Sequence, residues 1–190
     1  MVKGENGAVT SNPYIFSFTN LVIKQPVEQE QSTRNTIMTK DSVWQQLMDE
    51  NYKWWQANDK RSYEDMLVHA GLRGEAAILI GNFHYQTCNG GIGQWITNGY
   101  CLVIKRLHDI LTTIGNPIAD DLAGKLTKLM PFLNLGAKNQ GCMGDYWQTE
   151  FDEDHPAYEM CDEFDDWYYS VMDELHPVVE AWLSDHNKWL

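Results

Sequence analysis

From Asp41 onward, apolar residues recur at spacings of three and four, which is the period of amphipathic helices. The first stripe runs through Trp44, Leu47, Met48 and Tyr52. Helix-ending signals separate the later stripes, and they lie at Asn89-Gly90-Gly91, Asn98-Gly99 and Gly115. A chain of 190 residues is long enough for one domain with a proper core. We therefore predict an all-α fold, a single compact multi-helix domain.

The first 38 residues do not share this pattern. Residues 14–23 form the run that is rich in aromatic and β-branched residues, which is typical of a strand. A polar segment, residues 28–34, follows it. We divide the chain into an N-terminal arm, residues 1–38, and a helical domain, residues 39–190. The arm is either a short β-arm packed on the domain or a flexible leader, and the pattern leaves both open.

The net charge of −13 comes entirely from the C-terminal quarter. Residues 145–185 contain fourteen Asp and Glu and no Lys or Arg, whereas residues 1–144 contain thirteen acidic and thirteen basic residues. Such a surface repels nucleic acids and anionic membranes and attracts basic partners. We therefore expect no direct nucleic-acid binding and no membrane binding.

The acidic residues of this quarter fall on one side of a predicted helix. Phe164, Tyr168, Val171, Leu175, Val178 and Trp182 alternate in steps of four and three, which predicts a core-facing seam. Four acids spaced seven apart lie opposite that seam: Glu159, Asp166, Asp173 and Glu180. At ~1.5 Å per residue they span ~31 Å. The predicted partner-binding surface also includes Asp152, Glu153, Asp154, Asp162, Glu163, Asp165 and Glu174.

A helix face that carries only acidic residues lacks Glu–Lys pairs at i,i+4, each of which would stabilise the helix by ~0.2–0.5 kcal/mol. This cost favours a functional acidic face over one that serves solubility alone. Carboxylates pair with Arg much as phosphates do, so the face can occupy a surface built for DNA. Five aromatic residues interleave with the acids and would anchor a partner if exposed: Tyr146, Trp147, Tyr158, Trp167 and Tyr169.

The segment from Asn89 to Asn98 resembles the hallmark of the DNA-mimic protein family, an Asn-Gly-Gly run followed by Gln and an aromatic residue. The matching residues are Asn89, Gly90, Gly91, Gln94, Trp95 and Asn98. Phe164-Asp165-Asp166-Trp167-Tyr168 resembles a later element of that family. Ile92 departs from the commoner Phe, and Gln86 from an expected Glu. The resemblance implies an all-helical fold whose acidic surface imitates DNA and occupies the DNA-binding face of a repressor-like protein.

Physically, the residues of the Asn-Gly-Gly segment suit a structural corner between helices. Glycine permits positive φ, and Asn and Gln side chains satisfy peptide groups freed at a sharp turn. A Gly-rich phosphate cradle fits poorly, because neither a preceding strand nor a following Lys-Ser/Thr is present.

No nucleotide, hydrolase or metalloprotease motif occurs in the chain, so we predict a protein that is not an enzyme and has no catalytic residues. We predict no cofactor and no metal site. Two alternatives stay open: a helical interaction module that uses an apolar groove, and a small metal-dependent enzyme. For the latter, Asp152–His155 or the pair His69 and His84 would supply the ligands.

The predicted partner is a basic nucleic-acid-binding protein: a repressor, a nucleoid protein or a nuclease of a defence system. The chain would block that partner's nucleic-acid binding and so act as an inhibitor in transcription regulation or anti-defence. No apolar run approaches ~18 residues and no secretion signal opens the chain, so we expect a cytoplasmic protein in a bacterial cell. A phage or mobile element is a plausible source of its gene, and a homodimer stays open.

Overall fold

The computed structural model describes residues 42–59, 61–136, 146–148 and 156–185. The predicted N-terminal arm, with its strand-like run, lies outside these residues. The described part contains five α-helices and no strand, which confirms the all-α prediction. The helices are α1 (Val43–Ala57), α2 (Tyr63–Thr97), α3 (Ile104–Ile114), α4 (Pro117–Leu129) and α5 (Pro156–Ser184), with short 3-10 helices η2 (Tyr100–Val103) and η3 (Met130–Phe132).

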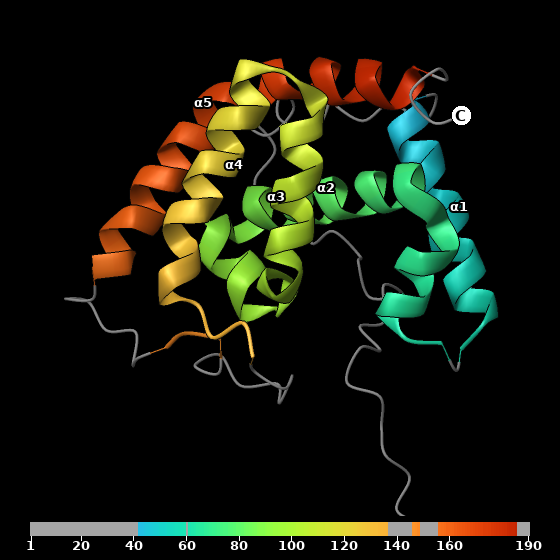
Figure 1. Cartoon of the computed structure of the whole chain (residues 1–190), viewed down its shortest axis with the longest axis horizontal. Coiled ribbons are helices and arrows are strands. Elements are labelled where there is room, and N and C mark those ends of the chain that lie inside the picture. The colour runs from blue at the N-terminus through green and yellow to red at the C-terminus, as the bar shows by residue number, and fades with distance from the viewer. Residues whose placement is uncertain (1–41, 60, 137–145, 149–155, 186–190) are drawn as a thin grey trace, which may run out of the picture.

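Local sequence signals set the helix ends. Ser62 and Asp65 form a reciprocal capping box at the start of α2. Gly115 ends α3 in the left-handed conformation, and Pro117 opens α4, whose N-cap is Asn116. Pro177 lies inside α5, and the helix continues past it to Ser184. Figure 1 shows α5 curving along the edge of the molecule.

α2 is three helical pieces rather than one. The backbone leaves helical geometry at Gly71, where φ is 62°, and again at Gly90 and Gly91, where the φ of Gly91 is 73°. Positive φ with extended ψ is a conformation that essentially only glycine adopts. Among the described residues, the middle piece is the most buried segment, and it crosses the centre of the molecule (Figure 1).

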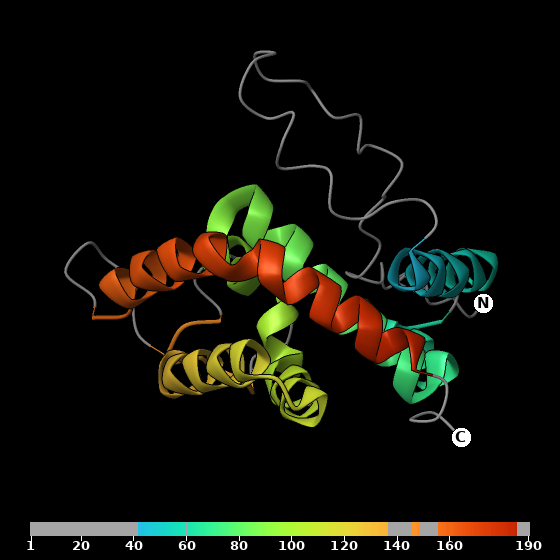
Figure 2. The same cartoon turned by 90° about the horizontal axis from the view of Figure 1, so that it is seen from above.

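The core lies between the middle of α2 and the flanking helices. Phe83 contacts Trp95 from α2 and Phe164 and Tyr168 from α5, edge to face, with ring centroids 5.2–6.0 Å apart. α3 and α4 pack on each other on one side, and α1 packs on α2 at the other end. Viewed from above, α5 spans most of the length of the described part and contacts α1, α2 and α4 (Figure 2).

Candidate functional site

The buried stripe of α5 fixes the helix on the fold. Its buried residues are Ala157, Cys161, Phe164, Tyr168, Met172, Leu175, His176, Val179, Trp182 and Leu183. Each fully buried large apolar side chain contributes ~1.5–3 kcal/mol. Repulsion between acidic neighbours on the outer side costs only ~0.2–0.5 kcal/mol per pair. The apolar anchor therefore outweighs the repulsion.

Six carboxylates on the opposite side of α5 are exposed: Glu159, Asp162, Glu163, Asp166, Asp173 and Glu174. We call these six residues the acidic ridge. Within the described part of the chain, none of them forms an ion pair with Lys or Arg. From Glu159 to Glu174 the helix rises about 22 Å, so the ridge carries one charge per about 4 Å. One strand of duplex DNA carries one per ~3.4 Å of axis.

One lysine borders the ridge. The Lys125 ammonium of α4 lies 4.8 Å from the centroid of the Trp167 ring on α5. The ammonium faces the ring in a cation–π arrangement, and it forms no ion pair with the carboxylates of the ridge. α5 thus already binds one cation through an aromatic ring.

Glu180 does not extend the ridge, and the prediction that it points outward is wrong. Its carboxylate accepts hydrogen bonds from the backbone N–H groups of Val43 (2.6 Å) and Trp44 (3.2 Å), so it caps the N-terminus of α1. A straight helix rotates about 20° per heptad, or about 60° over the three heptads from Glu159. This rotation places Met172 and Val179 in the buried stripe, where the predicted seam contained Val171 and Val178. Glu180 lies five full turns after Asp162 on the same line of the helix, and it is bonded inward because α1 packs against this end of α5.

Replacing Glu180 by Ala should lower the free energy of unfolding by about 1–2 kcal/mol, because two N–H groups at the start of α1 lose their acceptor. Glu174→Ala is the matched control, since Glu174 is an exposed Glu on the same helix. Urea unfolding followed by tryptophan fluorescence measures both. Equal losses for the two variants would contradict the capping role.

Asp165 also turns inward. Its Oδ1 accepts the backbone N–H of Ile92 at 2.7 Å, and this N–H belongs to the first residue of the last helical piece of α2. Partial burial raises the pKa of Asp165 to about 6, against the opposing effect of the Ile92 hydrogen bond. The neighbouring carboxylates of Asp162 and Asp166 act in the same direction as burial and contribute to this raised pKa. Asp165 is therefore a fold contact as well as a member of the predicted binding set.

Asp165 should make stability depend on pH. Its folded pKa exceeds its ordinary value of 3.8, so the folded state holds the proton more tightly. The stabilisation is full below about pH 4 and is lost as pH rises through about 6. Asp165→Asn keeps an oxygen acceptor for Ile92 but does not titrate. The difference in unfolding free energy, wild type minus variant, should fall between pH 4 and pH 7, as urea titrations will measure. A flat difference would refute this.

The Asn-Gly-Gly segment forms the helix corner that the sequence predicts. Gln94 and Asn98 each donate a side-chain amide hydrogen bond to Oε1 of Gln86, at 2.8 Å. Gln86 is buried, and a Gln there offers the acceptor that both amides need. Trp95 is buried against Phe83, whereas Asn89 is exposed. Gln94, Trp95 and Asn98 therefore make contacts within the fold.

Gly91 is needed for close approach as well as for its backbone angle. A Cβ atom at Gly91 would collide with the carboxylate of Asp165. The close contact between Gly91 and Asp165 therefore sets the rotation of α5 about its own axis. With Asp165 turned into the corner, Asp162 and Asp166 on either side of it point to solvent. The neighbouring hydrogen bond from the Ile92 N–H to Asp165 links residues 73 positions apart.

The remaining predicted site residues divide into three groups. Asp152, Glu153 and Asp154 lie outside the described residues. Of the five aromatic candidates, Tyr146 and Trp147 are buried and Trp167 is half-buried. Tyr158 and Tyr169 are exposed, at 46% and 38%.

The two histidines of the metal alternative do not meet. His69 stacks on Trp54 with a centroid distance of 3.8 Å, while His84 packs against His176 at 4.1 Å. Burial, together with His176, lowers the pKa of His84 to about 3. Across the described ranges, no three His, Cys, Asp or Glu side chains gather in a way that could hold a metal ion.

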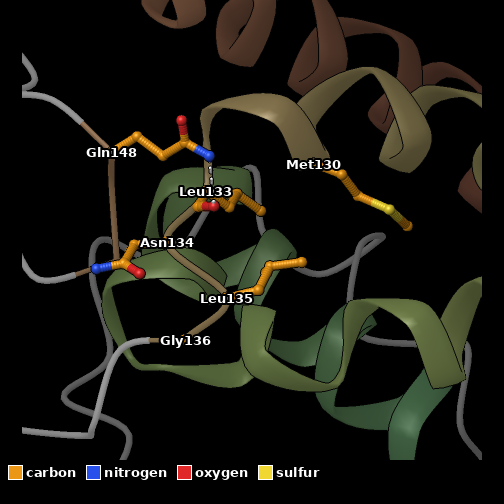
Figure 3. A pocket seen from close by; sticks show the side chains of 6 residues that line it. All are labelled: Met130, Leu133, Asn134, Leu135, Gly136 and Gln148. Carbon is orange, nitrogen blue, oxygen red and sulfur yellow. Dashed lines mark hydrogen bonds between the residues drawn. The ribbon is translucent and has the colours of Figure 1, made fainter.

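A shallow pocket of about 590 Å³ lies beside η3. Met130, Leu133, Asn134, Leu135, Gly136 and Gln148 line it, and Gln148 donates a hydrogen bond to the Leu133 carbonyl across its edge (Figure 3). Its lining carries no titratable side chain. It offers no group for acid–base or nucleophilic chemistry.

A family model described as DMP19-like protein matches residues 75–186, which is more than half of the chain. This chain belongs to the DMP19-like family. DMP19 is a DNA-mimic family whose members bind proteins and are not enzymes. The family resemblance is thereby confirmed, while the role of the Asn-Gly-Gly segment as a family hallmark stays a prediction. Searches among curated proteins and among solved structures gave no match.

The family match contains the helix corner and α5 together, so it includes the whole acidic ridge. Membership makes a nucleic-acid-binding protein the expected class of partner for this DMP19-like chain. None of the helices in the described residues is both long and apolar enough to span a membrane.

Proposed function

We propose that this DMP19-like chain is a DNA mimic that binds the basic nucleic-acid-binding surface of a partner protein and blocks its nucleic-acid binding. The partner is a repressor, a nucleoid protein or a defence-system nuclease, met in the cytoplasm of a bacterial cell. Such a role fits a protein that is encoded by a phage or mobile element and that inhibits host defence or transcription control. The acidic ridge carries the proposal.

The geometry of the ridge supports this function. Its carboxylates stand on one rigid helix, so they lose little freedom when a partner binds. Their spacing of one per about 4 Å is close to that of one DNA strand. Each can accept a bidentate pair from Arg, as a phosphate does. Because six like charges on one helix destabilise it, their presence favours a binding role over solubility.

A second candidate is the helical interaction module with an apolar contact surface. Val68 and Leu72, on either side of Gly71, are 70% and 66% exposed. Exposed aliphatic side chains at a helix corner favour a protein contact there. Binding through them would be insensitive to salt, whereas binding through the ridge is screened.

Affinity capture from a bacterial lysate tests the proposal and separates the two candidates. The full chain is immobilised, and the lysate is applied at ~0.05 M and at ~0.5 M salt. The bound proteins are identified by mass spectrometry. We expect basic nucleic-acid-binding proteins at low salt, their release by added duplex DNA, and their loss at high salt. Capture that persists at high salt and resists DNA would instead support the apolar module.

A further inference from the structure

Two exposed tyrosines stand beside the ridge on α5. Tyr158 and Tyr169 are among five large apolar side chains that are exposed in the described residues. The Tyr169 hydroxyl donates a hydrogen bond to the Thr87 carbonyl at 2.8 Å, which holds its ring in place. A large ring kept at the surface suits contact with a partner, because aromatic side chains lose little entropy on binding.

These tyrosines belong to an eleven-residue repeat. Residues 158–164 read Tyr-Glu-Met-Cys-Asp-Glu-Phe, and residues 169–175 read Tyr-Ser-Val-Met-Asp-Glu-Leu. Equivalent positions in the two copies have the same degree of burial and a similar type of side chain. The Tyr, Asp and Glu of each copy are exposed, while Cys161 matches Met172 and Phe164 matches Leu175 in the core.

Helix geometry makes the two copies face the same way. Eleven residues are three turns plus about 20°, with a rise of about 16.5 Å. The chain therefore presents one triad, Tyr158 with Asp162 and Glu163, and a second, Tyr169 with Asp173 and Glu174, in nearly the same orientation. In each triad the Asp lies four residues after the Tyr, where helix side chains are neighbours.

An aromatic ring beside two carboxylates suits one cation better than others. A guanidinium group stacks on a ring face while its N–H fork pairs with a carboxylate, whereas an ammonium is a strongly hydrated point charge. Lys125 over Trp167 shows that α5 already accepts a cation on a ring. The tyrosines thus add selectivity that the carboxylates alone lack.

We propose that the two triads are paired arginine subsites, and that the partner presents two Arg side chains about 16.5 Å apart. Two arginines eleven positions apart on one helix meet this requirement. The inference rests on the proposed function, since it specifies the partner surface that the ridge meets. It requires Arg rather than Lys, and it requires this spacing.

Three alanine-based helical peptides test it: two Arg eleven apart, two Lys eleven apart, and two Arg seven apart. Binding to the full chain is followed by NMR titration at low salt. We expect the first peptide to bind about tenfold more tightly than the second, because each of the two rings favours Arg over Lys by roughly two- to fivefold and the two factors multiply. The third should bind more weakly than the first because it reaches only one subsite. Tyr158→Leu with Tyr169→Leu should abolish the preference for Arg, and Tyr158→Phe with Tyr169→Phe should keep it.

Equal affinity for the Arg and Lys peptides overturns the inference, as does indifference to spacing. Retention of the Arg preference by the Leu variant also overturns it, and so does the absence of binding by all three peptides. The capture from lysate tests the proposed function separately, because its sensitivity to salt and to DNA does not depend on either tyrosine. The amide spectrum of each variant shows that it is folded.

Discussion

Gly91→Ala is expected to lower the free energy of unfolding by about 3 kcal/mol or more, the largest stability loss we predict for a single methyl group in this chain. Gly91 has φ of 73° with extended ψ, and a Cβ there would strike the Asp165 carboxylate. The new methyl group must either displace α5 or break the bond from Ile92 to Asp165. Urea unfolding followed by tryptophan fluorescence measures the loss.

Gly71 provides the matched control. It has nearly the same backbone angles, φ 62° and ψ 177°, but no atom lies within 4 Å of a Cβ placed there. Gly71→Ala should therefore show the backbone cost alone, about 1–3 kcal/mol. The excess loss for Gly91→Ala measures the contact with α5. Adding Asp165→Ala should remove most of that excess, and an additive double variant would contradict the contact.

The second large effect concerns affinity for the basic partner. Asp162, Asp166 and Asp173 changed together to Asn should weaken binding about 100-fold, because removing each carboxylate from the interface costs roughly 1 kcal/mol of binding free energy. Asn keeps the size of Asp and removes one charge at each position. The fold should be unharmed, and removing the repulsion between Asp162 and Asp166 should even stabilise it by ~0.2–0.5 kcal/mol.

Three acids at the other end of the molecule give the charge-matched control. Asp49, Glu50 and Asp59 are exposed on α1 and just after it. Changing them to Asn, Gln and Asn alters the net charge by the same amount. Their variant should bind the partner within about twofold of wild type, because charges beyond ~10 Å are largely screened. Equal weakening of both variants would mean that net charge, and not the ridge, attracts the partner.

The helices were predictable because their signals are local. Capping by Ser62 and Asp65, the stop at Gly115 and the start at Pro117 each depend on a few neighbouring residues. The outward acids from Glu159 to Glu174 were predictable from periodicity, since one face must be buried.

The inward roles of Asp165 and Glu180 were not predictable in this way. Asp165 meets Ile92, and Glu180 meets Val43, across 73 and 137 positions, and no local pattern encodes such pairings. The prediction also assumed a seven-residue period for the acids and the seam, whereas the buried stripe of α5 repeats every eleven residues, as at Cys161, Met172 and Leu183. The eleven-residue repeat from Tyr158 is the sequence signal that would have given the correct period.

The acidic ridge and nucleic acid should compete for one surface of the partner. With the purified partner bound to a labelled duplex, adding the full chain at fixed salt should release the duplex completely, with no complex containing all three. Fluorescence anisotropy and light scattering measure release and complex mass together. A stable ternary complex, or release by the Asp162, Asp166 and Asp173 to Asn variant at wild-type concentrations, would contradict the account.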